Sequence, residues 1–302
     1  MAWSEDSLHR WLAQRARPAG LVGAMGDDAA LLERMKGSPV VCCDQTIEGV
    51  HFLSGTDGRT AGAKAVCRSL SDLAASAATP RAVLLAISAP ADAEEEWLLA
   101  AIQGVHERGA EFGAELVGGD LSCAPGAAQL VVTAFGEFAG EASPGRDRAR
   151  EGQSIVATGP VGGSAAARHL ALQPRVPEGL WLHSLGATAM MDVSDGLAWD
   201  LYRMARSSGV QFEVDNVPIH ADAHDVGDGE SAEWHALHDG EDHELIATLD
   251  AKALERALRE KHEHCPELVV IGHVRAGSGL YLGQPGNLRE WNPGEGGWRH
   301  GS

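Results

Sequence analysis

The chain has 302 residues, of which 44% are hydrophobic and 22% are charged, and its formal net charge at pH 7 is −19. This composition is typical of a folded globular protein and excludes an intrinsically disordered chain. The 43 acidic residues outnumber the 24 basic ones, which opposes binding to nucleic acid or to an anionic membrane, and no apolar run is long enough to span a bilayer. A polyanionic substrate would therefore need bound cations to screen the charge of the protein.

The first half of the chain alternates short apolar runs with Ala-rich helical patterns. Residues 1–20 include acidic side chains and no continuous apolar stretch, so we predict a short amphipathic helix there and not a signal peptide. Strands are expected within residues 39–44, 81–88, 114–120 and 129–138, and helices at about 61–78 and 93–112. A polar segment that contains Gly and Pro, residues 140–153, follows these elements.

The second half repeats this scheme. Strands are expected within residues 154–159, 189–193, 210–214, 243–249 and 268–274, with a glycine-led helix from about residue 162 and another helix from about residue 195. Because the length favours two domains, we place the boundary in the polar segment and predict domains of residues 1–140 and 141–302. Both halves mix strands and helices, which indicates α/β or α+β domains with helices flanking mixed sheets and leaves the strand order open.

The cysteines predict a location and exclude one kind of site. There are five, Cys42, Cys43, Cys67, Cys123 and Cys265, and their odd number and scattered positions indicate reduced thiols in the cytoplasm. The adjacent Cys42 and Cys43 would point to opposite faces of a strand, so they would not easily share a metal ion. We interpret both as small buried hydrophobic residues, because free cysteine is usually buried.

Aspartates recur where predicted strands end or helices begin. These positions are Asp27, Asp28, Asp44, Asp120, Asp192 and Asp195. Loops at such positions expose side chains on a rigid scaffold, which favours a site assembled from several strand ends. The alternative for each aspartate is turn and helix-cap chemistry.

The stretch MDVSDG, residues 191–196, points to a metal. Either Ser194 or Asp195 is expected to cap the following helix. The apolar face of that helix is expected to comprise Leu197, Leu201, Met204 and Ala205. A cap explains one carboxylate but not both Asp192 and Asp195, and two carboxylates around a hydroxyl form the hard-oxygen environment that Mg²⁺ prefers. Since no phosphate-binding loop of the GxxxxGKS type occurs, a nucleotide would be held by metals and loop amides.

Seven short motifs occur in an order that resembles one enzyme family. They are GDDAALL, DQTIEGVHF, SLSDLAASAATP, GGDLS, TGPVGGSAA, MDVSDGLAWDL and DGEDHEL. The resemblance runs from about residue 24 to residue 298 and makes the chain similar to thiamine-monophosphate kinases. Their superfamily also holds aminoimidazole ribonucleotide synthetase, selenophosphate synthetase and a hydrogenase-maturation protein. The resemblance implies the two-domain fold of that superfamily and a homodimer paired through the N-terminal domains.

The same resemblance implies a kinase that transfers the γ-phosphoryl group of ATP to thiamine monophosphate and forms thiamine diphosphate, with the help of several Mg²⁺ ions. A phosphate acceptor is already anionic at neutral pH, so we expect no general base and therefore no catalytic acid–base residue. Such a site must bring two anions together and neutralise the transferring group. An acidic site that binds Mg²⁺ suits that task.

The resemblance also implies roles for individual residues. The metal ligands would be Asp28, Asp44, Asp72, Asp120, Asp192 and Asp195, with Cys42 and Cys43 contributing backbone oxygens only. The nucleotide would be bound by Gly118, Gly119, Arg146 and Ser194. The substrate would be bound by His51, Glu241 and Trp298, the last by stacking on the cationic thiazolium ring. The alternatives are a solvated helix face for Asp72, a turn for the two glycines and ordinary tail packing for Trp298.

Several positions depart from the family pattern. Cys42 and Cys43 stand where the family usually has small hydroxyl residues, and Ser76-Ala77 stands where Met-Gly is usual. Asp239 and His243 replace the common Gly and Tyr, and the segment before MDVSDG is shorter than usual. These changes leave two alternatives open, a related ATP-dependent enzyme with another metabolite acceptor and a non-catalytic module that binds Mg-ATP. Selenophosphate synthetase is disfavoured because no Gly-rich N-terminal segment carries a reactive cysteine.

Overall fold

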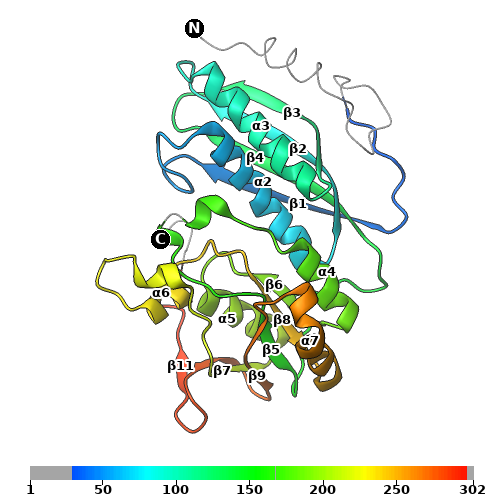
Figure 1. The fold of residues 1–302 in the computed structure, drawn as a ribbon, viewed down its shortest axis with the longest axis vertical. Coiled ribbons are helices and arrows are strands. Elements are labelled where there is room, and N and C mark those ends of the chain that lie inside the picture. The colour runs from blue at the N-terminus through cyan, green and yellow to red at the C-terminus, as the bar shows by residue number, and fades with distance from the viewer. Residues whose placement is uncertain (1–28, 167, 298–302) are drawn as a thin grey trace. The chain divides into compact units, whose positions relative to one another are not determined.

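The computed structural model describes residues 29–166 and 168–297 (Figure 1). The helix predicted for residues 1–20, the aspartates Asp27 and Asp28, and Trp298 lie outside this part of the chain. The described residues form two compact units. The first comprises the chain up to Leu73 together with Ala78–Gly140, and the second comprises Ala74–Ala77 together with the chain from Glu141. No helix of the described residues is long and apolar enough to cross a membrane.

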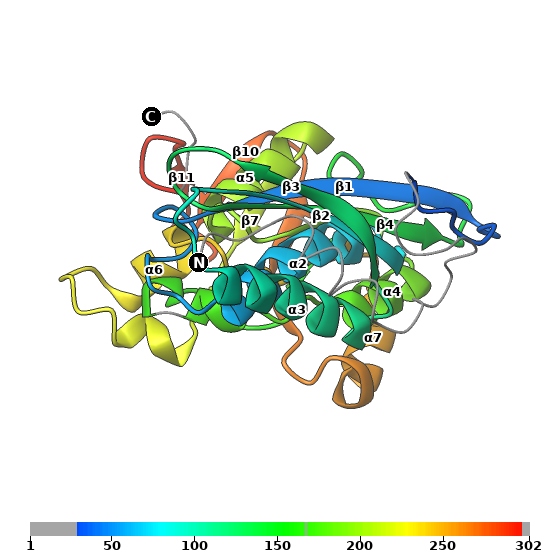
Figure 2. The ribbon, with the colours of Figure 1, turned by 90° about the horizontal axis from the view of Figure 1, so that it is seen from above.

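The N-terminal unit is a four-stranded mixed sheet in the order β1-β4-β2-β3. The strands are β1 (Ser38–Ile47), β2 (Thr79–Ala89), β3 (Glu115–Cys123) and β4 (Gln129–Phe138), and the helices are α2 (Gly58–Ala75) and α3 (Glu95–Glu111). Strand β4 is antiparallel to both β1 and β2, whereas β2 and β3 are parallel and are joined through α3. Figure 2 shows both helices on one face of this sheet.

The two helices of this unit pack backbone to backbone. A Cβ atom added at Gly62 would lie 2.0 Å from the carbonyl oxygen of Ala101, and one added at Gly104 would lie 2.1 Å from that of Arg59. Both predicted helices are confirmed to within three residues at each end. Helix α2 ends before Ala77, which has φ 52°, so the alanine that stands in place of the family's glycine occupies a left-handed conformation that favours glycine.

The C-terminal unit contains a seven-stranded mixed sheet in the order β11-β10-β7-β9-β5-β8-β6. Its strands are β5 (Ser154–Ala157), β6 (Met190–Asp192), β7 (Gln211–Val214), β8 (Leu245–Leu249), β9 (Val269–Arg275), β10 (Gly279–Leu282) and β11 (Arg289–Trp291). Its helices are α4 (Val176–Leu185), α5 (Leu197–Ser208), α6 (Ala232–His238) and α7 (Ala251–His264), with three short 3₁₀ helices, η1 (Ser164–Ala166), η2 (Arg168–Ala171) and η3 (Ala221–His224). The predicted apolar face of α5 is confirmed, since all four of its residues are fully buried.

Two predicted elements of this unit are wrong in detail. The glycine-led helix from about residue 162 is absent from the described structure, which has the short helices η1 and η2 there. Gly162 and Gly163 have φ 93° and 84°, and an added Cβ at either would lie 2.7 Å from a neighbouring segment, so these glycines serve close packing and not helix entry. The strand predicted for residues 243–249 begins only at Leu245, because His243 has φ 51° and cannot continue a strand.

Candidate active site

Two of the predicted metal ligands of the N-terminal unit meet around Cys42. Asp44 lies in β1 and Asp72 lies in α2, and the Cys42 thiol donates a hydrogen bond to the carbonyl oxygen of Ser69 at 3.1 Å. Burial, together with the charges of Asp72 and Asp44, raises the pKa of the Cys42 thiol well above its usual range. The thiol therefore stays neutral and would not bind a hard cation. Asp44 and Asp72, in contrast, both lie close enough to Cys42 for their charges to raise its pKa.

Cys43 does not fit its sequence interpretation. Its side chain is exposed, and Cys42 is only half-buried, so the expectation that both would be buried is wrong. The reason is topological, because β1 is an edge strand and Cys43 faces away from the helices. The prediction that the two thiols point to opposite faces is in keeping with their alternating exposure.

The GGD motif lies at the other edge of the same sheet. Gly118, Gly119 and Asp120 belong to β3, which is separated from β1 by β4 and β2. The strand register aligns Asp44 with Gly119 across the sheet, and Asp120 is one residue further along β3. The side chain of Asp120 therefore points to the face opposite the helices, whereas that of Asp44 points to the helix face. An added Cβ at Gly119 would lie 1.8 Å from the carbonyl oxygen of Leu85, so this glycine is required within the strand and is not part of a turn.

The tautomer of His51 follows from its hydrogen bonds. The residue is buried just after β1, its Nδ1 accepts the backbone N–H of Ile47 at 3.0 Å, and its carbonyl oxygen accepts a hydrogen bond from the buried ammonium group of Lys64. Because Nδ1 is an acceptor, the neutral ring carries its proton on Nε2. His51 can thus donate a hydrogen bond to an anionic oxygen without being charged.

In the C-terminal unit, the MDVSDG and DGEDHEL motifs are joined backbone to backbone. The N–H of Glu241 donates to the carbonyl of Ser194, and two further bonds link Val193 to His243 and Glu244, all three at 2.8 Å. An added Cβ at Gly240 would lie 2.7 Å from the Ser194 carbonyl oxygen, so the close approach requires glycine. The fold therefore brings Asp192, Ser194, Asp195 and Glu241 into one loop pair.

The predicted helix cap is wrong, and the structure replaces it with a residue that sequence reasoning missed. Helix α5 is preceded by Gly196, with no side-chain cap. The buried Asp200 instead reaches back and accepts the N–H groups of Ser194 and Asp195, each at 2.9 Å. Burial raises the pKa of Asp200 to about 8. In the sequence, an acidic residue in a first helical turn reads as an ordinary partner of the helix dipole, so the only signal for Asp200 is its spacing from MDVSDG.

Asp192 and Asp195 have different surroundings. Asp192 is 6% exposed and its Oδ2 lies 3.0 Å from Nδ1 of His243. Asp195 is more exposed and forms an ion pair with Arg203, a second residue missed from the sequence, which also contacts Asp200 and lies over the ring of Trp199. The partner of Asp192 is therefore a histidine ring, whereas the partner of Asp195 is the permanently charged guanidinium group of Arg203.

The Asp239 that stands in place of the family's glycine has a structural role. Its two carboxylate oxygens lie 2.8 Å from Nδ1 of His235 and 3.1 Å from the N–H of Gly163, and Nε2 of His235 lies 3.2 Å from Asp228. Burial lowers the pKa of His235, but the hydrogen bonds and charges of Asp239 and Asp228 outweigh it and raise the pKa above its usual value. His235 thus joins α6 to the loop that precedes it.

This arrangement predicts a pH-dependent stability. Because the folded pKa of His235 is raised, its stabilising effect is complete below the unfolded pKa of about 6.5 and is lost as the pH rises through the folded value. We expect Asp239→Asn to lower the melting temperature more at pH 6 than at pH 8, as measured by calorimetry. An equal loss at both values would contradict this role of His235.

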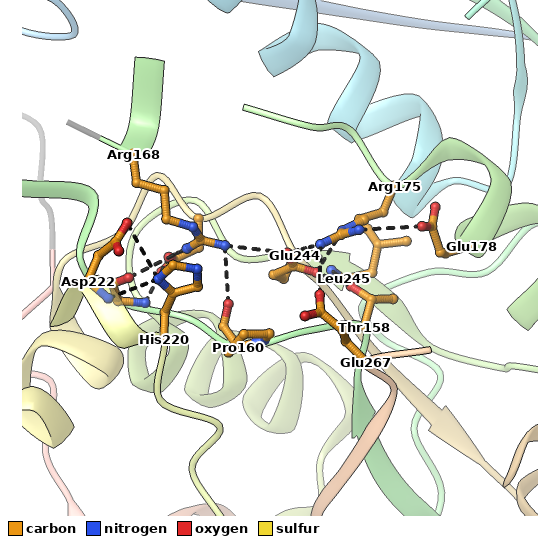
Figure 3. Close-up of polar contacts among 12 residues, drawn as sticks. Thr158, Pro160, Arg168, Arg175, Glu178, His220, Asp222, Glu244, Leu245 and Glu267 are labelled. Atoms are coloured by element: carbon orange, nitrogen blue, oxygen red, sulfur yellow. Dashed lines mark hydrogen bonds and ion pairs between the residues drawn. The ribbon is translucent and has the colours of Figure 1, made fainter. Parts of the chain in front are cut away.

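A buried ionic network holds the DGEDHEL loop from the other side. Glu244 accepts hydrogen bonds from the hydroxyl of Thr158 at 2.6 Å and from Nε and Nη2 of Arg175 at 2.9 and 2.5 Å (Figure 3). Arg168 pairs with Asp242 at 2.6 Å, and Asp242 also accepts the N–H of Gly162 at 2.8 Å. Both neighbours of His243 in the sequence are therefore fixed by charge-assisted hydrogen bonds.

The structure does not bring Arg146 to the MDVSDG loop, because its hydrogen-bond contact is at the opposite end of α5. The side chain of Arg146 is exposed, and its carbonyl oxygen accepts a hydrogen bond from Ser208 at 3.1 Å. Trp298 lies outside the described residues, but an added Cβ at the preceding Gly297 would be 3.1 Å from the carbonyl oxygen of Asp195. The chain that leads to Trp298 therefore passes beside MDVSDG.

No group of three or more His, Cys, Asp or Glu residues that could hold a metal ion is present within residues 29–166 and 168–297. Mg²⁺ is usually bound by one or two carboxylates and completes its shell with water and phosphate oxygens. Carboxylate ligands of this type are available at Asp44, Asp72 and the buried Asp192. The neutral thiol of Cys42, which lies beside Asp44 and Asp72, is not a suitable ligand for Mg²⁺.

Comparison with known proteins identifies the family. Residues 26–138 match the family AIR synthase related protein, N-terminal domain, and residues 150–283 match AIR synthase related protein, C-terminal domain. Thiamine-monophosphate kinase of Rhodopirellula baltica is 34% identical over 294 residues, which cover 92% of this chain and 91% of that protein. The enzyme of Corynebacterium glutamicum is 37% identical over 255 residues, or 74% and 76% of the two chains. The chain belongs to the thiamine-monophosphate kinase family.

Solved structures agree with this family assignment. The crystal structure of thiamine-monophosphate kinase from Stenotrophomonas maltophilia superposes with a TM-score of 0.79 at 31% identity, covering 93% of this chain and 97% of that one. A second structure, of AaThiL complexed with AMPPCP and TMP, gives a TM-score of 0.72 at 27% identity and covers 98% and 95%. The two-domain α/β fold expected from the resemblance is thereby confirmed, and the motifs lie on that scaffold.

Proposed function

We propose that this protein transfers the γ-phosphoryl group of ATP to thiamine monophosphate and so forms thiamine diphosphate. The observation that carries the proposal is the likeness to thiamine-monophosphate kinases over most of the chain, including a relative solved with AMPPCP and TMP bound. The site geometry supports it in part: Asp192 ends β6, and the backbone bonds between the MDVSDG and DGEDHEL loops hold Ser194 and Glu241 beside each other. Asp44 and Asp120, in contrast, lie within β1 and β3, so the expectation that they stand at strand ends is wrong. A phosphate acceptor needs no base, and its binding groups have only to position and neutralise two anions.

Magnesium is part of this proposal. Asp44 and Asp72 of the N-terminal unit, and separately Asp192 of the C-terminal unit, would be ligands of the several ions, because carboxylate oxygens suit a hard cation. Bound Mg²⁺ would neutralise the charge of the phosphate groups as they approach each other. Ser194, Arg146 and the backbone of Gly118 and Gly119 would bind the nucleotide.

The substrate side of the site is proposed to comprise His51, Glu241 and Trp298. His51 presents an Nε2–H that can donate to a phosphate oxygen. Glu241 is held beside Ser194 by its backbone and has φ 52°, a conformation that non-glycine residues adopt rarely and that is common at functional sites. Trp298 would stack on the cationic ring of thiamine. We also propose a cytoplasmic location, which the five free cysteines support.

We further propose a homodimer in which the N-terminal sheets face each other. Val41 is 61% exposed, and Leu84, Val131 and Phe135 are only half-buried on the face of the sheet opposite the helices. Asp44 and Asp120 stand three strand spacings apart, about 14 Å, and point to opposite faces, so within one chain they would not bind the same ion. A second copy packed on the open face with its β3 edge along β1 would bring its own Asp120 to the edge strand that carries Asp44.

Mixed dimers test this arrangement. We expect Asp44→Asn and Asp120→Asn to be nearly inactive alone, whereas a purified dimer with one subunit of each kind should recover about half of the wild-type activity, because one of its two sites has both carboxylates. Two differently tagged subunits would be co-expressed and purified over both tags before assay. No recovery in the mixed dimer would contradict a site shared between copies.

A further inference from the structure

We propose that His243 is a positioning residue for Asp192, and that it sets the affinity of the site for its divalent cation. This inference rests on the proposed function, in which Asp192 is a ligand of that cation. It concerns a residue of this chain that stands where the family usually has tyrosine, so neither the resemblance nor the relatives assign it a role.

The hydrogen bond between the two residues has a defined polarity. Nδ1 of His243 lies 3.0 Å from Oδ2 of Asp192, and the two residues are 3% and 6% exposed. An ionised carboxylate only accepts, so the proton of this bond belongs to Nδ1. One carboxylate oxygen of Asp192 is thereby fixed, which orients the other oxygen and removes rotamers that would carry it away from a ligand.

The backbone holds His243 in a conformation that it would not adopt on its own. Its φ of 51° is unfavourable for a residue with a Cβ. Its N–H donates to the carbonyl of Val193 at 2.8 Å, and its neighbour Asp242 is fixed by Arg168. Its other neighbour, Glu244, is fixed by Arg175 (Figure 3). Such a conformation persists only where the surroundings determine it, and here they aim the imidazole at Asp192.

The other ring nitrogen adds an independent observation. Nε2 of His243 is buried and has no hydrogen-bond partner among the residues that the structure describes. With the proton on Nδ1, this nitrogen carries a lone pair and can accept a hydrogen bond. A buried acceptor without a partner calls for a bound group, and a water molecule in the shell of a cation held by Asp192 has the donor that this nitrogen requires.

A pair of variants separates the hydrogen bond from the packing. His243→Asn keeps an N–H donor near the position of Nδ1 and tolerates φ near 50°, because asparagine enters the left-handed region more readily than most residues. His243→Phe keeps an aromatic ring and loses the donor. Mn²⁺ binding to each protein in the presence of the non-hydrolysable analogue AMPPCP would be measured by electron paramagnetic resonance, which needs no turnover.

We expect His243→Phe to weaken Mn²⁺ binding by about tenfold or more. The same variant should raise the Mg²⁺ concentration for half-maximal activity by a similar factor, with a smaller change in kcat. In His243→Asn, Mn²⁺ binding should stay within about threefold of wild type. Unchanged Mn²⁺ binding in the Phe variant, or an equal loss in both variants, would overturn the positioning role. Should the Phe variant fail to fold, His243→Gly, which relieves the backbone strain, takes its place in the comparison.

A third variant distinguishes this inference from the function on which it rests. Asp192→Asn should reduce Mn²⁺ binding more than any change at His243. A strong loss in Asp192→Asn with no loss in His243→Phe would refute the positioning role alone. Unchanged binding in Asp192→Asn would refute both the role of Asp192 as a ligand and the inference built on it.

Discussion

Asp44→Asn is expected to lower kcat/KM for phosphoryl transfer by about 10²-fold to 10³-fold, because a neutral amide cannot offset the charge of a cation placed between two anions. Asp44 is the one acidic residue of β1, and the thiol of Cys42 beside it stays neutral. No other side chain of this strand therefore supplies the negative charge that the variant lacks. The loss should exceed any change in stability, since the side chain is partly exposed.

The matched control for this variant is Asp92→Asn, which removes the same charge from an exposed turn in the same unit. Steady-state rates of ADP formation would be measured over a range of Mg²⁺ and ATP concentrations. If the Asp44 variant turns over within about threefold of wild type while the control is normal, Asp44 is not a metal ligand of this site.

Arg175→Met is expected to destabilise the C-terminal unit by about 3–5 kcal/mol, because it leaves the carboxylate of Glu244 buried without its main partner. The side chain of Glu244 is 3% exposed and receives two hydrogen bonds from this arginine. The remaining partners, Thr158 and the more distant Arg168, do not neutralise it to the same degree. A loss of this size corresponds to a fall in melting temperature of roughly 10 °C for a unit of this length.

The control for this prediction is Arg259→Met, which removes an exposed pair with Glu260 and should change the stability by less than about 1 kcal/mol. The double variant Arg175→Met with Glu244→Gln should recover part of the loss, since the uncompensated charge is then gone. Thermal unfolding followed by calorimetry gives all three values. An Arg175 variant as stable as the Arg259 variant would show that the network contributes little.

Local sequence signals predicted those parts of the fold that depend on local chemistry. The strand that ends at Asp192 and the apolar face of α5 follow from short-range patterns, and the structure has both. The glycine-led helix was wrong because Gly162 and Gly163 read equally well as a helix start and as a close contact, and only the distant residues Ala236 and Asp222 decide between them.

Long-range pairing explains what the sequence could not predict of the site. The exposure of Cys43 follows from the edge position of β1, which no local pattern encodes. The sequence pattern of Asp200 and Arg203 is that of ordinary helix residues, and only the fold shows that they contact Ser194 and Asp195 of MDVSDG. The contact of His243 with Asp192 joins residues 51 positions apart and needed the pairing of β6 with β8. The family resemblance supplied roles for residues, but not these contacts.

The proposed kinase activity is tested by analysis of the products formed from ATP, thiamine monophosphate and Mg²⁺, with chelator and with thiamine in place of its phosphate as controls. We expect thiamine diphosphate and ADP in equal amounts, formed only when Mg²⁺ is present and not formed from thiamine. Measurable binding of Mg-ATP without thiamine diphosphate would contradict it, and would point instead to another acceptor or to a protein that binds the nucleotide without transferring its phosphate.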